Sequence, residues 1–257
     1  MVKQGKPFAI PLEGRAVRAV RIDGPDAPPL VFLHEGLGSI AQWRDFPGAL
    51  CEAAGRPGLV YERFGYGGSA PPPPGTRTPR YLHVEADRLV GVLDALRIAR
   101  ADLVGHSDGG SIALLAAARA PGRFGRLATI AAHVMVEEAT LAGIRAAAEA
   151  WRTTDLRVRL QRYHGAGTEA LFAAWAETWL SPPFRNWNIE GELKLLTAPL
   201  LALQGERDEY ATPAHLDRIK AAVGGPCVTW LVPAAAHHPH LQARDEVVDR
   251  LAAFFRV

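Results

Sequence analysis

Sulfur is scarce in this chain. Its 257 residues include two cysteines, Cys51 and Cys227, and two methionines. The cysteines lie far apart in the sequence and do not form a pair with the spacing of a metal site. A structural disulfide between them is one alternative, but a reducing compartment is the simpler interpretation.

Excess charge and long apolar runs are also absent. The net charge is +2 with the histidines neutral, which provides no basic field toward nucleic acid or a membrane surface. No stretch is long and apolar enough to cross a bilayer, and residues 1–7 lack the apolar run of a signal peptide. We therefore expect a soluble, cytoplasmic protein without nucleic-acid or membrane partners. Composition carries no information on its oligomeric state.

Short apolar segments alternate with helical segments along most of the chain. Residues 81–98 carry apolar side chains at helical spacing, and 245–255 form the last expected helix. The expected strands are residues 15–22 (antiparallel), 30–33, 58–61, a segment at Leu103, 127–132, 199–203 and 228–232. This alternation predicts an α/β fold with a mainly parallel sheet covered by helices on both faces.

Residues 133–195 interrupt the alternation because they contain no convincing strand. Their composition is helical and rich in aromatic side chains suited to lining a pocket, namely Trp151, Tyr163, Trp175, Trp179 and Trp187. We expect a helical cap over 133–195, inserted into a core formed by residues 1–132 and 196–257. For most of these tryptophans, packing within the cap is the alternative to ligand contact.

Residues 105–109 read Gly-His-Ser-Asp-Gly, a G-x-S-x-G pattern between a short apolar strand and an apolar helix. A serine between strand and helix must turn sharply, and Gly105 and Gly109 remove the Cβ atoms that would collide there. The turn would lift the Ser107 hydroxyl above the sheet at a helix N-terminus, where free N–H groups favour negative charge. Ser107 is therefore a candidate nucleophile, with a glycine-rich turn of no chemical role as the alternative.

A serine nucleophile needs a base, and the base needs a third group to hold it. In this topology the acid follows a late strand and the histidine comes last. Residues 204–210 and 233–240 follow the last two expected strands and supply both types. The acid candidates there are Glu206, Asp208 and Glu209, and the histidine candidates are His237, His238 and His240.

Five motifs in order resemble those of the α/β-hydrolase superfamily over nearly the whole chain. They are the oxyanion loop at 33–39, the D-x-x-G-x-G-x-S-like loop at 62–69, the elbow at 105–109, the G-x-x-D acid turn at 205–208 and the H-x-P-H-like end at 237–240. The Ser-Asp-Gly-Gly elbow and the cap most resemble the valacyclovir-hydrolase-like branch. The resemblance implies an eight-stranded α/β-hydrolase fold with an inserted cap.

The resemblance also implies the roles of individual residues. Ser107 would be the nucleophile, His237 the base and Asp208 the acid that holds it. The backbone N–H groups of Gly36 and Asp108 would form the oxyanion hole. The implied activity is cofactor-free hydrolysis of a small or medium carboxylic ester through an acyl-enzyme.

Other activities on the same fold stay open. The nearest alternative is hydrolysis of a carbon–carbon bond in a ring-cleavage product, followed by hydrolysis of thioesters, amides or amino-acid esters. A ligand receptor without turnover is an alternative of a different class. The small-molecule substrate itself is not determined, because the cap sets it.

Two residues depart from the usual pattern of the superfamily. Glu35 stands where glycine is common, and we expect it to brace the oxyanion loop, with exposure to the pocket as the alternative. Asp108 follows the nucleophile directly, where a carboxylate beside a developing oxyanion needs compensation. An arginine, a substrate ammonium group or solvent would supply it. The sequence supports two interpretations of Asp108 equally: it binds an amine of the substrate, or it is a solvated charge at the helix N-terminus.

The candidate substrate-binding residues are Glu35, Asp108, Trp151, Trp175 and Trp179. His106 occupies the variable position of the elbow, and we expect it to pack structurally. The remaining histidines lack ligand spacing, so the sequence predicts no metal site.

Overall fold

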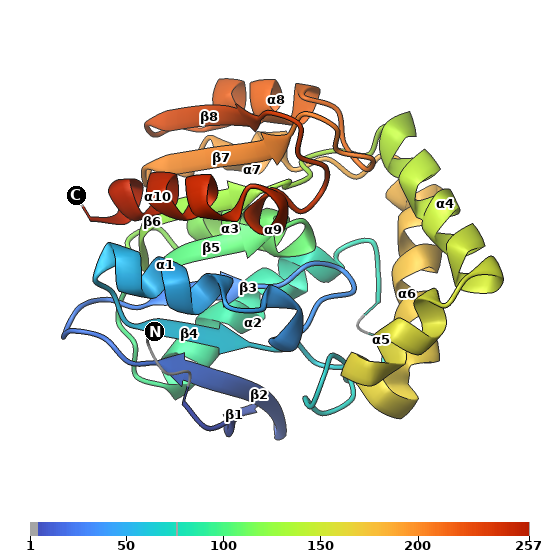
Figure 1. Ribbon diagram of the computed structural model, residues 1–257, viewed down its shortest axis with the longest axis horizontal. Coiled ribbons are helices and arrows are strands. Elements are labelled where there is room, and N and C mark those ends of the chain that lie inside the picture. Colours follow the sequence, from blue (N-terminus) through green and yellow to red (C-terminus); the bar gives the residue numbers. More distant parts are fainter. Residues whose placement is uncertain (1–4, 76, 257) are drawn as a thin grey trace.

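A single mixed sheet lies at the centre of the computed structural model, which describes residues 5–75 and 77–256 (Figure 1). The eight strands have the order β1-β2-β4-β3-β5-β6-β7-β8. β1 and β4 pair antiparallel with β2, and the other neighbours pair parallel. The expected α/β fold with a mainly parallel eight-stranded sheet is therefore confirmed. The strands are β1 (Phe8–Leu12), β2 (Arg15–Ile22), β3 (Leu30–Leu33), β4 (Gly58–Tyr61), β5 (Ala101–His106), β6 (Phe124–Ile130), β7 (Leu200–Gly205) and β8 (Cys227–Val232).

Helices cover both faces of this sheet (Figure 1). One apolar cluster joins the sheet to α1 and α10, and a second joins it to α2, α3 and α8. All six residues of β5 are buried, as expected for a central parallel strand with helices on both sides. The helices of this layer are α1 (Phe46–Ala54), α2 (Tyr81–Ala95), α3 (Asp108–Arg119), α8 (Ala214–Ala222), α9 (Pro239–Gln242) and α10 (Arg244–Phe255).

Four helices lie between β6 and β7, in the segment expected to form the cap. They are α4 (Glu138–Thr153), α5 (Leu156–His164), α6 (Thr168–Leu180) and α7 (Glu190–Leu193). α4, α5 and α6 stand beside the ends of the parallel strands, on the right in Figure 1, whereas α7 packs against α3 and α8. The division of the chain at residues 133 and 195 stays a prediction. Within the described part of the chain, no helix combines the length and apolar character that crossing a membrane requires.

His164, the last residue of α5, ties this helical segment to the core. Its Nδ1 accepts a hydrogen bond from the Gly67 N–H at 3.1 Å, and its Nε2 donates to the Leu37 carbonyl at 2.9 Å. Leu37 lies in the loop after β3, and Gly67 lies in the loop after β4. One buried imidazole therefore fixes two core loops to the end of α5.

β1 is the strand that the sequence patterns did not predict. It contains Pro11, and proline lacks the N–H that a strand interior needs. The strand forms because β1 is an edge strand that pairs only with β2, where proline is tolerated. β6 also starts earlier than expected, at Phe124, and ends at Ile130.

Candidate active site

Ser107 lies at the sharp turn between β5 and α3. Its φ and ψ angles are 53° and −118°, a conformation that costs a non-glycine residue about 1–3 kcal/mol. The flanking glycines permit the turn by close approach. A Cβ on Gly105 would lie 2.2 Å from the Gly109 carbonyl oxygen, and one on Gly109 would lie 2.0 Å from the Leu33 carbonyl oxygen. The strained serine and its two glycines therefore have the geometry that the pattern predicts for a nucleophile elbow.

Asp208 and His237 meet beyond the ends of β7 and β8. His237 Nδ1 lies 2.8 Å from Asp208 Oδ1, which also accepts the Tyr210 N–H at 2.9 Å. Burial pushes the pKa of Asp208 upward, but the hydrogen bond from His237 and its charge outweigh burial, so the pKa lies below its ordinary value. Because Nδ1 donates to the carboxylate, Nε2 keeps the lone pair that a general base needs.

The other acids near His237 hold the backbone instead of the ring. Glu209 accepts the His237 N–H at 3.1 Å, and Glu206 accepts the Ala234 N–H at 2.9 Å. The ring of His240 is buried against Trp43. Among the acid and histidine candidates, Asp208 and His237 are thus the pair joined by their side chains.

Ser107 and His237 line the same cavity of about 80 Å³. Gly36, Trp175 and Trp179 also line it, so helix α6 forms one wall. A Cβ on Gly36 would lie 2.3 Å from Trp175 Nε1, which shows how closely the tryptophan covers the loop after β3. Trp151 was expected at this cavity but does not line it, because its ring stacks on Phe172 with centroids 4.1 Å apart.

The peptide between Glu35 and Gly36 is held from its carbonyl side. Its oxygen accepts hydrogen bonds from Arg63 Nη2 at 2.6 Å and from His34 Nδ1 at 2.8 Å. In a trans peptide the N–H points away from the carbonyl. Arg63 and His34 therefore fix the direction of the Gly36 N–H, the proposed oxyanion donor, on the opposite side.

Asp108 is buried, with 1% of its surface exposed, so the alternative of a solvated charge at the helix N-terminus is wrong. Its Oδ2 lies 3.4 Å from Arg63 Nη1. The same oxygen accepts a hydrogen bond from the Tyr81 hydroxyl, with an O–O distance of 2.9 Å. Burial, and then the Asp108 charge, raise the pKa of Tyr81 well above its ordinary value, so the hydroxyl stays protonated. The compensation that Asp108 needs comes from an arginine.

The Glu35 carboxylate does not brace its own loop. It lines the cavity and pairs with His238, with Oε1 3.5 Å from Nε2. Burial pushes the pKa of Glu35 upward, but the charge and hydrogen bond of His238 outweigh burial and lower the pKa to about 2. Arg63 braces the loop instead. The Glu35 carboxylate faces the cavity, which was the alternative interpretation of the sequence.

Arg63 and Tyr81 are the site residues that the sequence patterns did not identify. Arg63 lies within the motif at 62–69, but nothing in its spacing shows that it reaches both Asp108 and the Glu35 carbonyl. A second cavity of about 290 Å³ lies between the loop after β4 and α6. Arg77 lines it, and within the described residues its buried Nη1 has no hydrogen-bond partner.

Known proteins resemble this chain in sequence and fold. A family model of the α/β-hydrolase fold matches residues 28–220. The mouse (Mus musculus) protein Serine hydrolase BPHL is 30% identical over 198 residues, which cover 73% of this chain and 65% of the mouse protein. The chain thus spans slightly less than two thirds of that relative.

Two further proteins are similar over different shares of the chain. A 2-hydroxymuconate semialdehyde hydrolase of Pseudomonas sp. (strain CF600) is 38% identical over 100 residues, covering 38% of this chain and 34% of that protein. The structure of 2-hydroxy-6-oxo-6-phenylhexa-2,4-dienoate hydrolase from Rhodococcus sp. strain RHA1 superposes with a TM-score of 0.78 at 18% identity, covering 100% of both chains. The latter likeness shows the fold alone.

Proposed function

This chain belongs to the α/β-hydrolase family, and from that premise we propose that it is a serine hydrolase acting on a small or medium carboxylic ester. The observation that carries the proposal is the shared cavity. Ser107, on its strained elbow, and His237, held by Asp208, line it together. The similarity to a serine hydrolase over 73% of the chain supports the same assignment.

The mechanism follows from the positions of these groups. The Ser107 Oγ attacks the acyl carbon while His237 Nε2 accepts its proton, and the imidazolium then protonates the leaving alcohol. Asp208 keeps the ring in the required tautomer and stabilises the imidazolium. Water, activated by His237, next hydrolyses the acyl-enzyme and releases the acid.

The negative charge of the tetrahedral intermediate falls on one oxygen. The N–H groups of Gly36 and Asp108 would donate to it, because one belongs to a peptide fixed by Arg63 and the other begins α3. The first N–H groups of a helix have no intrahelical acceptor. Each such donor typically contributes a factor of about 10²–10³ in kcat.

The charges around the cavity point to the class of ester. Three carboxylates line it, those of Glu35, Asp108 and Glu209, while no lysine or arginine among the described residues does. Arg63 and Tyr81 both contact Oδ2 of Asp108, and within the described residues Oδ1 accepts no hydrogen bond. Asp108 therefore has an oxygen available for a hydrogen-bond donor in the cavity. We propose that esters with an ammonium group near the scissile carbonyl are preferred.

A fluorophosphonate probe and a series of esters test the proposal. The probe should add one covalent label on Ser107, located by peptide mass spectrometry, and hydrolysis of p-nitrophenyl esters should show a burst. Ser107→Ala is the matched control, which should neither label nor turn over. Tight ligand binding without label or turnover would instead support a receptor.

Carbon–carbon bond hydrolysis is the second candidate function. The observation that favours it is the second cavity, where Arg77 Nη1, without a hydrogen-bond partner among the described residues, would hold a carboxylate such as ring-cleavage products carry. The partial similarity to a 2-hydroxymuconate semialdehyde hydrolase supports the same candidate. The test is the rate of hydrolysis of a vinylogous 2-hydroxy-6-oxo acid. A rate above that of every ester tested, reduced in Arg77→Gln, would support carbon–carbon bond hydrolysis.

A further inference from the structure

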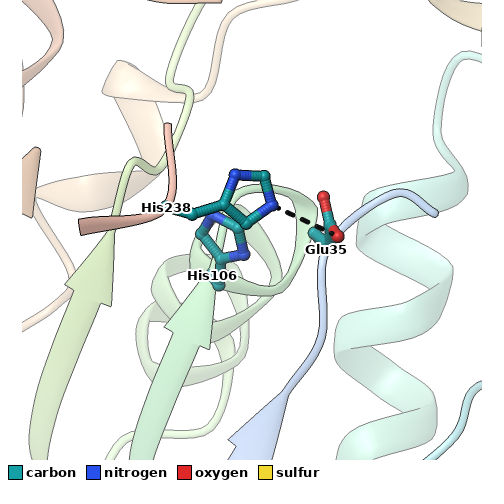
Figure 2. Close-up of side chains that lie close together, drawn as sticks. All are labelled: Glu35, His106 and His238. Atoms are coloured by element: carbon teal, nitrogen blue, oxygen red, sulfur yellow. Dashed lines mark ion pairs between the residues drawn. The ribbon is translucent and has the colours of Figure 1, made fainter. Parts of the chain in front are cut away.

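Three side chains that take no part in the catalytic steps lie close together (Figure 2), and two of them, Glu35 and His238, line the catalytic cavity. Glu35 follows β3, His106 ends β5, and His238 lies in the loop after β8. One potential ligand atom from each lies within 4.8 Å of the other two. Segments far apart in the sequence thus bring a carboxylate and two imidazoles to one place.

His106 presents a ring nitrogen that is free to bind a metal ion. His106 Nε2 donates to the His237 carbonyl at 2.8 Å, so Nδ1 carries the lone pair. Two imidazoles and one carboxylate form a common ligand set for Zn²⁺ and related ions.

A second observation at the same place indicates room for a ligand. A small cavity of about 10 Å³ is lined by two of the three residues, Glu35 and His106. That volume fits one water-sized ligand. Four buried polar atoms of other residues that line it have no hydrogen-bond partner within the described residues: Ser39 Oγ, Gln42 Oε1, Trp43 Nε1 and His240 Nδ1. Ordered water there would satisfy such atoms and supply a further oxygen ligand.

We propose that Glu35, His106 and His238 form a binding site for a divalent transition-metal ion of the zinc class. Ligand atoms around tetrahedral zinc are about 3.3 Å apart, and the Glu35 Oε1–His238 Nε2 distance is already 3.5 Å. The remaining adjustment falls on Glu35 and His238, whose side chains are 20% and 36% exposed. His106 is buried and fixed by its hydrogen bond to His237.

The bound ion would sit between the two parts of the proposed catalytic site. Glu35 precedes the oxyanion donor Gly36, and His238 follows the base His237. Because Glu35 and His238 also line the catalytic cavity, an ion held between them would restrict that cavity and inhibit hydrolysis. This inhibition rests on the proposed function, whereas ion binding does not.

Direct binding of cobalt tests the site independently of activity. Tag-free protein, stripped with a chelator, is titrated with Co²⁺, whose visible absorption bands report imidazole coordination. We expect one saturable site from which Zn²⁺ displaces Co²⁺. Glu35→Gln and His238→Gln should each weaken binding at least about tenfold. The control is His83→Gln, which breaks a His83–Glu192 pair of 2.7 Å that belongs to no three-ligand group among the described residues.

The outcomes separate the metal site from the catalytic proposal. Absence of saturable Co²⁺ binding, or equal weakening by His83→Gln, overturns the site whether or not the protein hydrolyses esters. Saturable binding weakened by Glu35→Gln and His238→Gln alone supports it even in a protein without esterase activity. Where esters are hydrolysed, saturating Zn²⁺ should reduce kcat/KM in the parent. A chelator should reverse this loss, and His238→Gln should reduce the sensitivity to Zn²⁺.

Discussion

Replacing Arg63 with methionine should destabilise the fold through the charge left behind. Arg63 is buried against Asp108, with side chains 4% and 1% exposed. Removing one member of a buried ion pair typically costs about 3–5 kcal/mol, because the other charge stays unpaired. The Tyr81 hydroxyl still donates to Asp108, so we expect the lower end, about 3 kcal/mol. For a chain of this size that corresponds to a fall in Tm of about 6–12 °C.

Thermal and urea unfolding of matched variants isolate this cause. Arg63→Met combined with Asp108→Asn removes the orphaned charge, so the double variant should recover at least half of the lost Tm. Arg88→Met is the control: Arg88 is as buried as Arg63, but its partners Glu13 and Glu85 are 44% and 13% exposed, so neither is left as deeply buried as Asp108. The free energy of unfolding of this control should fall by about 1 kcal/mol through loss of its ion pairs. An Arg63→Met protein that melts within about 2 °C of the parent would refute the argument.

The same variants separate stability from catalysis. The double variant still lacks the guanidinium that holds the Glu35 carbonyl, so its kcat should stay below that of Asp108→Asn alone. Losing an oxyanion donor outright costs about 10²–10³, and losing only its orientation should cost about tenfold to a hundredfold. Equal kcat in the two proteins would show that Arg63 does not position the Gly36 peptide.

Three further predictions concern the proposed catalytic residues. Ser107→Ala should reduce kcat about 10⁶-fold with unchanged circular dichroism, and retention of most activity in a folded variant would contradict the mechanism. His237→Ala should reduce kcat far more than His238→Ala or His240→Ala, since only His237 contacts the buried acid; a severe loss confined to His238→Ala would contradict the assignment. The parent should hydrolyse an amino-acid ester about one to two decades faster in kcat/KM than a neutral ester of equal size. Asp108→Asn should remove that difference, and equal rates in the parent would exclude amine binding by Asp108.

Local rules explain what the sequence predicted. The elbow motif spans five positions, and the steric limit at Gly105 is set within it, by the Gly109 carbonyl oxygen. Strand–helix alternation likewise follows from short-range patterning, and it yielded the sheet and its two helical layers. The sequence patterns did not predict β1 because Pro11 opposes strand formation in general. The residue is tolerated there because β1 lies at the edge of the sheet.

Local rules did not predict which side chains pair across the fold. The position of Asp108 after Ser107 was enough to predict that its charge needs a compensating group. Its partner Arg63 lies 45 positions earlier, and the two meet only after β4 and α3 have packed. The pairing of Glu35 with His238 likewise joins loops after β3 and β8. A pattern in the chain cannot show which long side chains the sheet order brings together.

The two hydrogen bonds of His164 couple access to the site with its catalytic geometry. The same ring contacts Leu37, next to Gly36, and Gly67 in the neighbouring loop. Movement of α5 away from the core must break at least one of these bonds, so opening of the helical segment and disorder of the oxyanion loop are linked equilibria. Linkage is reciprocal: a ligand that orders the loop must protect α5 from opening by the same free energy. Hydrogen exchange in α5 would then register occupancy of a cavity that this helix does not line.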